Sequence, residues 1–510
     1  MTGRAVGIGW AAVVVLSAGL RLWGLTAKSL WFDETVSVFL ASQPLERMLA
    51  LVAANDPHPP LHYLLLHFWM AFFGSGEAAV RVLSVLISVP VVAVTWAFGR
   101  RLVGAGPALF AALLVAVAPS QVAAGQEARM YGLLTLTALL SWWALWGAAS
   151  GGDRRDDGGI SGDRRAWVTY AVATAAMLYS HYFGFFVVAS QMGYLIWRRT
   201  DSEQWRRWVY ASLGVVLLFL PWMPCFIQQL AGGRAWPAHR VPLAPTTLVD
   251  TLAAMTVGRP ILDHWGPKLT TIQAAGTPWI AVIGLIAAVA LVVAAVRGSN
   301  IRRDTIAPLI AAALGPPVLA FAVSLGLNVY APRYLLFIVP PVALLVAGGA
   351  AALAGGPKRW GIVAGLLLPI LVLIPNAAGT MAFHRQPRLD VFDWRLVSRT
   401  LAEQARPDDA IAFLPGFSRI PVNYYFHGPQ PRIVLTPRGE GDVEGPGGAG
   451  LAQVADGLAR HQRVWILTVP PVPPAVGALL EALGSRGFEV RRQEAVNMVR
   501  LILVERLQDK

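Results

Sequence analysis

The sequence has very few cysteines and few charged residues for its length. Among its 510 residues there is one cysteine, and only 14% are Asp, Glu, Lys or Arg. A single cysteine excludes a disulfide within the chain and a cysteine-rich metal site. The sequence also has no Walker-type glycine-rich loop ending in Lys and Ser or Thr, so it offers no nucleotide site of that class. Disulfide scaffolds and P-loop enzymes are therefore excluded.

Hydrophobic residues are abundant instead, at 55% of the chain. A soluble protein of this length could not bury so much apolar surface, so the composition indicates a multi-pass membrane protein. The net charge of +13 comes from short arginine clusters between apolar runs. Clusters of this kind are typical of topology signals, and we expect no nucleic-acid partner. The first apolar stretch lacks a small-residue cleavage site and ends at Arg21, which predicts an uncleaved first span.

Apolar windows of about 17 to 24 residues are long enough to cross a membrane. They predict eleven transmembrane helices, which begin near residues 6, 78, 104, 131, 166, 183, 207, 273, 306, 334 and 360. With a cytoplasmic N-terminus, the arginine pairs at 100–101, 198–199 and 302–303 fall on one side. Positively charged loops favour the cytoplasm, so this side is the predicted interior. The odd number of spans then places the C-terminal part outside.

The first outer loop is predicted to hold two interfacial helices. Leu45, Met48, Leu49 and Val52 form one apolar stripe at helical spacing. Pro59-Pro60 then starts a second helix over Leu61–Phe73, because proline in the first helical turn loses no hydrogen bond. At about 13 residues, this second segment is short for a span.

The composition changes after about residue 380, where helical and strand patterns alternate. Such alternation predicts a small α/β domain. The expected organisation is thus an all-α membrane domain over 1–380 and an extracytoplasmic α/β domain over 381–510. Helices are predicted at 392–405, 451–460 and 475–486, and strands at 410–414, 432–436, 464–469 and 498–505.

Two neighbouring carboxylates, Asp33 and Glu34, follow the first span directly. Carboxylates are costly to keep near hydrocarbon, so their position indicates a function. One of them could remove a proton from an acceptor hydroxyl while the other orients a partner. The alternative is that the pair caps a helix that starts near Thr35, because carboxylates stabilise helix N-termini.

Other polar residues stand at the predicted outer ends of spans. His58, close to Asp56 and followed by Pro59-Pro60, would lie at a helix start, where it suits a phosphate or a polar substrate. Arg129 could bind phosphate oxygens through its fork-shaped guanidinium, or form an ion pair that fixes helices. The remaining candidates for substrate binding are Tyr131, His181, Tyr182, Arg333 and Tyr334, although aromatic residues at such positions often form only interfacial belts.

Several segments resemble one known group of proteins. "WFDETVSV", "DPHPPLHYLLLHFW", "QEARMYGLLTL", "SHYFGFF" and "APRYLLFIVPP" occur in this order. They resemble motifs of the bacterial glycosyltransferase family 39-like membrane proteins, over about residues 6 to 380. These proteins belong to the C-type glycosyltransferases, together with protein O-mannosyltransferases and lipid A aminoarabinose transferases.

The resemblance implies an enzyme of the bacterial plasma membrane that transfers a sugar from a polyprenyl-phosphate donor to an acceptor glycan, lipid or protein on the outer face, with inversion. Asp33 would be the general base and Glu34 its neighbour. His58 stands where some relatives carry a lysine that contacts the lipid phosphate, while Arg129 and Arg333 could compensate the charge of the leaving phosphate. Some relatives use a divalent metal near this loop, but Asp56 and His58 alone are too few ligands to predict one.

A transporter or flippase of an anionic polyprenyl lipid is the main alternative. It would also place arginine, histidine and carboxylate groups in a membrane cavity. Such a protein is expected to have inverted repeats and broken helices, and the sequence gives no sign of either. A third interpretation, a non-catalytic scaffold, predicts that replacing Asp33 has no functional effect.

Overall fold

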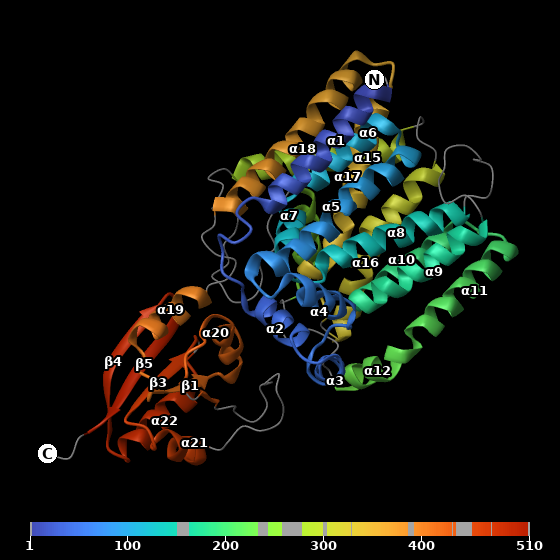
Figure 1. The fold of residues 1–510 in the computed structure, drawn as a ribbon. Helices are drawn as coiled ribbons and strands as arrows, with labels where there is room; N and C mark the ends of the chain where they lie inside the picture. The colour runs from blue at the N-terminus through green and yellow to red at the C-terminus, as the bar shows by residue number, and fades with distance from the viewer. Residues whose placement is uncertain are drawn as a thin grey trace. The chain divides into compact units, whose positions relative to one another are not determined.

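We describe the fold from a computed structural model of the chain (Figure 1). The structure describes residues 3–149, 163–232, 243–257, 278–298, 303–327, 329–385, 392–430, 432–434, 451–470 and 472–507. The chain forms two compact units. The membrane unit comprises Met1–Leu25 and Pro57–Gln386, and the α/β unit comprises Thr26–Asp56 and Pro387–Lys510. Residues 26–56 group with the C-terminal part, and the domains expected over 1–380 and 381–510 stay a prediction.

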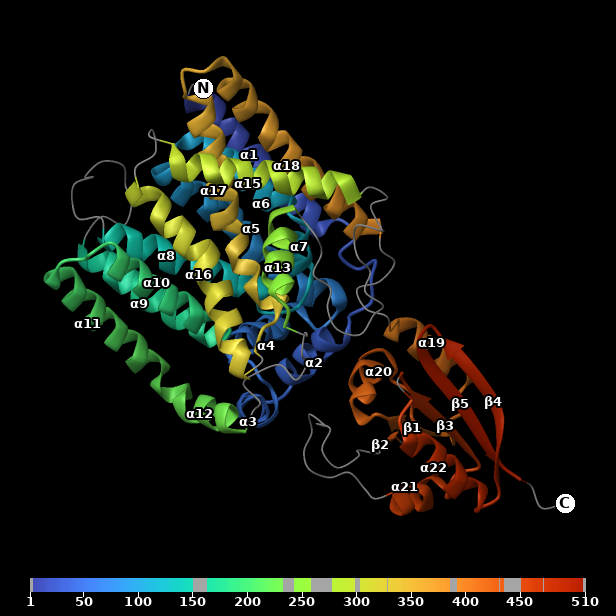
Figure 2. The same ribbon diagram turned by 180° about the vertical axis from the view of Figure 1, so that it is seen from behind.

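The membrane unit is helical throughout its described residues, and Figure 2 shows the helices from the opposite side. The helices are α1 (Gly3–Leu22), α4 (Leu61–Phe73), α5 (Glu77–Leu102), α6 (Ala105–Val117), α7 (Pro119–Gln126), α8 (Tyr131–Ala149), α9 (Asp163–Ser180), α10 (Gly184–Trp197), α11 (Ser202–Phe219), α12 (Met223–Ala231), α13 (Pro245–Val257), α15 (Pro278–Arg297), α16 (Arg303–Leu327), α17 (Val339–Ala354) and α18 (Arg359–Arg385), with 3-10 turns η1 (Leu220–Trp222) and η2 (Pro332–Ile338).

All eleven predicted span positions hold helices. Within the described residues, eight helices are long and apolar enough to cross a membrane, and a bent pair, α6 and α7, makes nine. Of the other two, α10 has only 14 residues and α9 opens on Asp163, Arg164 and Arg165. The prediction of a multi-pass membrane protein is therefore confirmed, while eleven crossings and their orientation stay predictions. The loop predicted over 224–272 contains most of α12 and all of α13, and residues 233–242 and 258–272 lie outside the described part.

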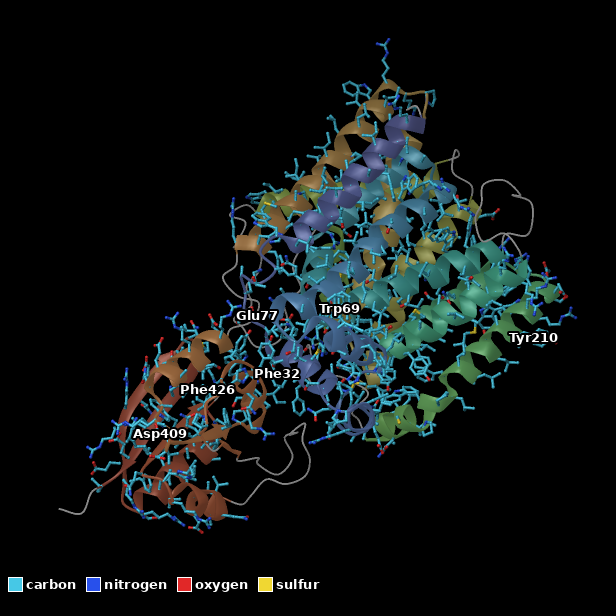
Figure 3. All side chains as sticks on the ribbon, viewed as in Figure 1. Phe32, Trp69, Glu77, Tyr210, Asp409 and Phe426 are labelled. Carbon is cyan, nitrogen blue, oxygen red and sulfur yellow. The ribbon has the colours of Figure 1, made fainter. Side chains whose placement is uncertain are left out.

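Residues at the surface of the membrane unit are as expected for helices in lipid. On α11, Tyr210 is 64% exposed and Leu217 68% exposed (Figure 3). Small residues allow close contact between the helices inside: a side chain on Gly349 of α17 would collide with the carbonyl oxygen of Leu291 on α15. Close backbone approach at glycine is typical of membrane helix packing, where apolar burial alone does not drive association.

The bend between α6 and α7 measures 56°. Pro119 begins α7, and a proline at the first helical position cannot continue the hydrogen bonding of the helix before it. The break leaves carbonyl oxygens at the end of α6 without a partner inside the helix. One of them, Val117 O, accepts a hydrogen bond from Thr380 Oγ1 of α18 at 2.6 Å. The apolar window that begins near residue 104 predicts one continuous span, so the break at Pro119 is not visible in the hydropathy pattern.

The α/β unit contains a five-stranded sheet of order β2-β1-β3-β5-β4. Strand β1 (Ala410–Leu414) pairs in parallel with β2 (Arg432–Val434) and β3 (Arg463–Thr468), whereas β5 (Val499–Arg506) is antiparallel to β3 and to β4 (Phe488–Val496). In the register, Ala412 lies opposite Ile433 and Ile466.

Two hydrophobic cores cover the two faces of this sheet. One contains Trp394, Val397 and Leu401 of α19 (Trp394–Gln404) packed with Phe413 and Trp465. The other contains residues of α21 (Leu451–Leu458) and α22 (Pro474–Gly484) against the opposite side chains of the strands. The alternation of side chains along each strand produces this division. The predicted α/β domain is confirmed.

The details of this unit differ from the predictions in two places. The sequence analysis missed β4, because its central residues are charged or polar and give no apolar signal, and it missed α20 (Arg419–Tyr425), which is short and contains Pro421. The predicted strand over 432–436 is described only over 432–434.

The first-loop helices are α2 (Phe32–Ala41), α3 (Leu45–Asn55) and α4. In α3, Met48 and Val52 are fully buried, but Leu45 is 41% exposed, so the predicted stripe is only partly used. Helices are present at both expected places, as α3 and α4, and α2 is a third helix in this loop. Their position at the membrane surface remains a prediction.

Candidate active site

The acidic pair lies in the first turn of α2, in the α/β unit. Glu34 is fully buried, and its Oε2 accepts a hydrogen bond from the backbone N–H of Trp31 at 3.2 Å. This is the reach-back bond of a capping box, in which the third helical residue satisfies the N-cap amide. The capping interpretation therefore holds for Glu34, while Asp33 is half-buried in the same turn.

Asp56 and His58, two residues apart, belong to different units. Asp56 is 7% exposed and is the C-cap residue of α3 in the α/β unit. His58 is 4% exposed and precedes α4 in the membrane unit. They supply two metal ligands where a catalytic site usually has three. No group of three or more His, Cys, Asp or Glu side chains in the described residues could hold a metal ion. Among the described residues, Asp56 and His58 alone therefore do not make up a metal site.

Four predicted residues of the membrane unit meet around Tyr334. The His181 ring lies 4.4 Å from the Tyr334 ring and 5.1 Å from the His58 ring, measured between centroids. His58 lies 5.8 Å and Tyr131 6.1 Å from Tyr334. These side chains come from four different segments, before α4, at the start of α8, between α9 and α10, and in η2. We call them, together with Arg129 and Arg333, the cationic cluster.

The two arginines of the cationic cluster are held by tyrosine hydroxyls. Arg129 is 4% exposed, and its Nη1 donates to Tyr63 Oη at 3.4 Å. Arg333 Nη2 donates to Tyr334 Oη at 3.3 Å. The His62 ring Nε2 lies 3.1 Å from the Ala128 carbonyl oxygen, next to Arg129. His62 and Tyr63 of α4 thus support the arginine loop, a role that the motif "HPPLHY" contains but that its sequence alone does not reveal.

His181 is a neutral hydrogen-bond donor. Its Nδ1 accepts from the backbone N–H of Phe183 at 3.1 Å, so the ring proton is on Nε2. Burial lowers the pKa of His181 well below its ordinary value, and the neighbouring His58, Arg129 and Arg333 lower it further. The Nε2–H is buried and finds no hydrogen-bond acceptor among the described residues. A buried donor of this kind favours a ligand oxygen, because leaving it unsatisfied is costly.

Tyr182 follows His181 directly in the sequence, and its hydroxyl and ring contact residues outside the cationic cluster. Its hydroxyl donates to Gln229 Oε1 at 2.5 Å and accepts from Trp222 Nε1 at 3.0 Å. Its ring lies 4.8 Å from the Phe226 ring. These contacts join Tyr182 to η1 and α12, and its place among the substrate-binding residues stays a prediction.

Arg21 and Gln126 form a support that the sequence analysis missed. Arg21 is fully buried and its Nη1 donates to Ala116 O, near the end of α6, at 3.1 Å. Gln126 Nε2, at the end of α7, donates to Arg21 O at 3.0 Å and to Trp23 O at 2.8 Å, at the end of α1. Arg21 thus satisfies a carbonyl near the end of α6, and Gln126 satisfies carbonyls at the end of α1. These bonds tie the end of α7, three residues before Arg129, to α1.

A second contact joins α7 to η2. Gln121 Nε2 donates to Leu336 O at 2.8 Å. Arg333 and Tyr334 lie in η2, so the two segments that carry the arginines are connected through α7. The signal for this network was the polar run in "PSQVAAGQE", which is unusual inside an apolar window.

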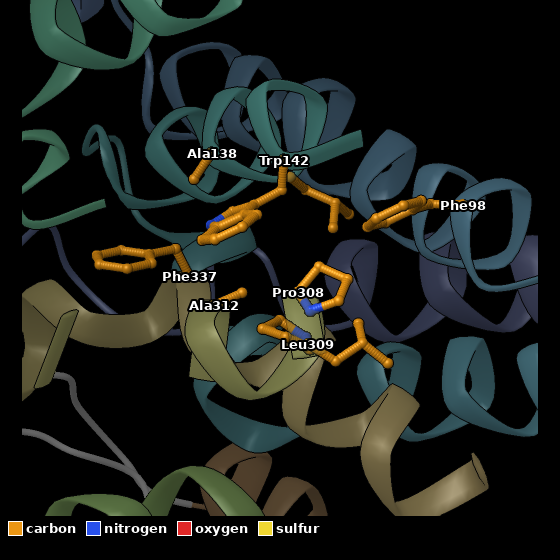
Figure 4. Close-up of a pocket in the computed structure, with 9 residues that line it drawn as sticks. Phe98, Ala138, Trp142, Pro308, Leu309, Ala312 and Phe337 are labelled. Carbon is orange, nitrogen blue, oxygen red and sulfur yellow. The ribbon is translucent and has the colours of Figure 1, made fainter. Parts of the chain in front are cut away.

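One apolar pocket lies between α5, α8, α16, η2 and α17 (Figure 4). Phe98, Trp142, Pro308 and Phe337 are among its lining residues. Its free volume is about 10 Å³, which is hardly enough for one water molecule. It is a packing gap and not a substrate site.

Comparison with known proteins agrees with this fold. The model of the family described as dolichyl-phosphate-mannose-protein mannosyltransferase matches residues 57–227. No curated protein sequence matches the chain. The structure is similar to ArnT from Cupriavidus metallidurans in the apo state, with a TM-score of 0.60, 14% identity and 98% of each chain covered.

Two further structures are also similar. ArnT from the same organism bound to undecaprenyl phosphate gives a TM-score of 0.56 at 15% identity, with 99% of this chain and 98% of that chain covered. The apo oligosaccharyltransferase of Archaeoglobus fulgidus gives 0.59 at 11% identity, with 92% of this chain and 70% of that one covered. The chain therefore has the fold of these structures, as the resemblance led us to expect.

Proposed function

We propose that the protein is a membrane glycosyltransferase that moves a sugar from a polyprenyl-phosphate donor to an acceptor hydroxyl, with inversion at the anomeric carbon. The observation that carries the proposal is the cationic cluster, in which arginine, histidine and tyrosine side chains from four segments meet in the membrane unit. Its fold is that of ArnT, a structure of which holds undecaprenyl phosphate. A lipid-borne phosphate has the charge that this cluster would bind.

The proposed reaction needs a base and a stabilised leaving group. Asp33 takes the proton of the acceptor hydroxyl, and the acceptor oxygen attacks the anomeric carbon on the face opposite the phosphate. The bond between that carbon and the phosphate oxygen breaks, and its electron pair stays on the phosphate. Arg129 and Arg333 meet the charge that develops there, which is the type of stabilisation that usually dominates catalysis.

The proposed location is the outer face of a bacterial plasma membrane, with the N-terminus in the cytoplasm. The polyprenyl tail would enter between the lipid-exposed helices, which leaves the sugar at the membrane surface. The acceptor is a glycan, lipid or protein that reaches this surface.

The experiment that tests the proposal compares three full-length variants. Asp33→Asn keeps the size of the side chain but cannot accept the proton, so turnover should fall by roughly 10²- to 10⁴-fold. Glu34→Gln should mainly lower thermal stability, because Glu34 caps α2 through Trp31 N. Asp201→Asn is the matched control, because Asp201 caps α11 through Gln204 N but lies in a different loop.

Near-normal turnover of Asp33→Asn would exclude it as the base. The transport alternative gains one observation, the bend between α6 and α7, since broken helices occur in transporters. A labelled polyprenyl phosphate in reconstituted vesicles distinguishes the two: movement across the membrane without sugar transfer would replace the proposal by a flippase.

A further inference from the structure

The α/β unit has a ligand-binding topology at the edge where β1 ends. Strands β2 and β3 flank β1 on its two sides in parallel, which makes β1 the point where the direction of the crossovers reverses. Ligands of open α/β sheets bind beside the carboxyl ends of the strands at such a point. Here β1 is followed by the turn η3 (Gly416–Ser418) and then by α20.

The elements after β1 contact the acidic segment of the same chain, which we define as residues 26–41. The Leu30 backbone N–H donates to Tyr425 Oη at 2.7 Å, and the two residues are 395 positions apart. The Phe32 ring meets the Phe417 ring edge to face, at 5.0 Å and 66°. Helices α2 and α20 lie side by side in both views (Figures 1 and 2), and Phe32 is labelled in Figure 3.

A third contact holds the beginning of the acidic segment. Arg395 Nη2, on α19, donates to the Thr26 carbonyl oxygen at 3.0 Å. The three contacts fall at residues 26, 30 and 32, immediately before the acidic pair. Because Phe32 is the first residue of α2 and Asp33 the second, any shift of these contacts displaces the carboxylate of Asp33.

We propose that the α/β unit is a positioning domain, which holds the acidic segment against α20 and η3 and thereby fixes Asp33 for the reaction. The catalytic part of this inference rests on the proposed function, and the docking of the segment stands independently of it. Tyr425, Phe417 and Arg395 are positioning residues, because they act through the acidic segment and do not touch the reacting atoms.

The test measures backbone amide exchange and turnover in the full-length protein. Tyr425→Phe removes the acceptor for the Leu30 N–H. Losing a hydrogen bond worth about 1 kcal/mol should make amide exchange roughly five-fold faster in peptides that cover residues 26–41. Phe417→Ala should add to this. Under the proposed function kcat should fall by a similar factor with the donor KM unchanged, because the base acts in the transition state.

Arg486→Gln is the matched control. Its guanidinium binds Asp456 at 2.7 Å in the same unit, between α22 and α21, so it tests general destabilisation of the unit. Unchanged exchange over 26–41 in both Tyr425→Phe and Phe417→Ala would overturn the docking. Faster exchange with unchanged kcat would overturn the positioning role. Faster exchange combined with normal turnover of Asp33→Asn would instead remove the proposed function and leave the docking intact.

Discussion

Replacing Gly125 tests whether the support beneath Arg129 is as tightly packed as the structure indicates. Gly125 lies in α7, one residue before Gln126. A Cβ atom added there would lie 2.5 Å from Ser88 Oγ and 2.9 Å from Arg21 Cδ. Gly132 in α8 faces the same serine but with more space, since a Cβ there would lie 3.6 Å from Ser88 Cβ. The two glycines therefore share Ser88 as a neighbour but differ in the space available for a side chain.

The expected cost follows from these distances. Gly125→Ala requires Ser88 Oγ to move by about 0.9 Å to reach an ordinary contact of 3.4 Å, and overpacking of this kind costs about 1–3 kcal/mol. The movement also disturbs the bond from Arg21 Nε to Ser88 Oγ, at 3.1 Å, which adds roughly 1 kcal/mol or more. Gly132→Ala needs no movement and should be neutral or gain up to about 1 kcal/mol from helix propensity.

The assay is the apparent melting temperature of both variants in the same detergent, followed by donor binding. Gly125→Ala should melt lower than the parent protein and Gly132→Ala should not. Donor binding should weaken in Gly125→Ala alone, because α7 leads directly to Arg129. Equal stability of the two variants would refute the packing argument, and with it the role given to Arg21 and Gln126.

Three further predictions concern the cationic cluster and the orientation. Arg129→Gln and Arg333→Gln should each weaken binding of a polyprenyl phosphate by about 10- to 100-fold; unchanged binding with a large loss of stability would make them structural. The pKa of His181 is lower in the folded protein than in the unfolded chain, so the protein should lose stability as the pH falls below about 6.5. His181→Gln should remove this dependence of the melting temperature on pH, and His427→Gln, at an exposed histidine, is the control. In a Cys225→Ser background, Ser202→Cys should react only with permeant reagents and Met498→Cys with impermeant ones; the reverse pattern would invert the topology.

The membrane helices could be predicted because hydrocarbon imposes one rule on them. A long apolar window predicts a membrane-spanning helix by itself, without information from the rest of the chain. The prediction was weakest where a local rule was broken by tertiary partners. The window that begins near residue 104 is continuous in hydropathy, yet Pro119 bends it, and Thr380 on a distant helix satisfies the Val117 carbonyl.

The sequence could predict which residues belong to the candidate site, but not how they are arranged. His58, Arg129, His181 and Tyr334 were recognisable because polar groups at the ends of spans are costly and need a reason. Their mutual distances depend on how the helices pack, which no local pattern contains. The same holds for Leu30 and Tyr425, whose contact joins residues 395 positions apart, and for Tyr182, whose position next to His181 in sequence suggested a shared role.

The neutrality of His181 has a physical reason within the proposed reaction. The donor phosphate is a diester with one negative charge, and the leaving group is a monoester that approaches two. Arg129 and Arg333 bring two permanent positive charges. A third charge on His181 would be buried beside them, and like charges so close disfavour one another. A neutral imidazole avoids this repulsion and still presents its Nε2–H to an oxygen. The cationic cluster thus combines two positive charges, which match the leaving phosphate, with a hydrogen-bonding N–H that adds no charge. In the proposed reaction this arrangement stabilises the lipid phosphate as the bond breaks, without binding it too tightly for release.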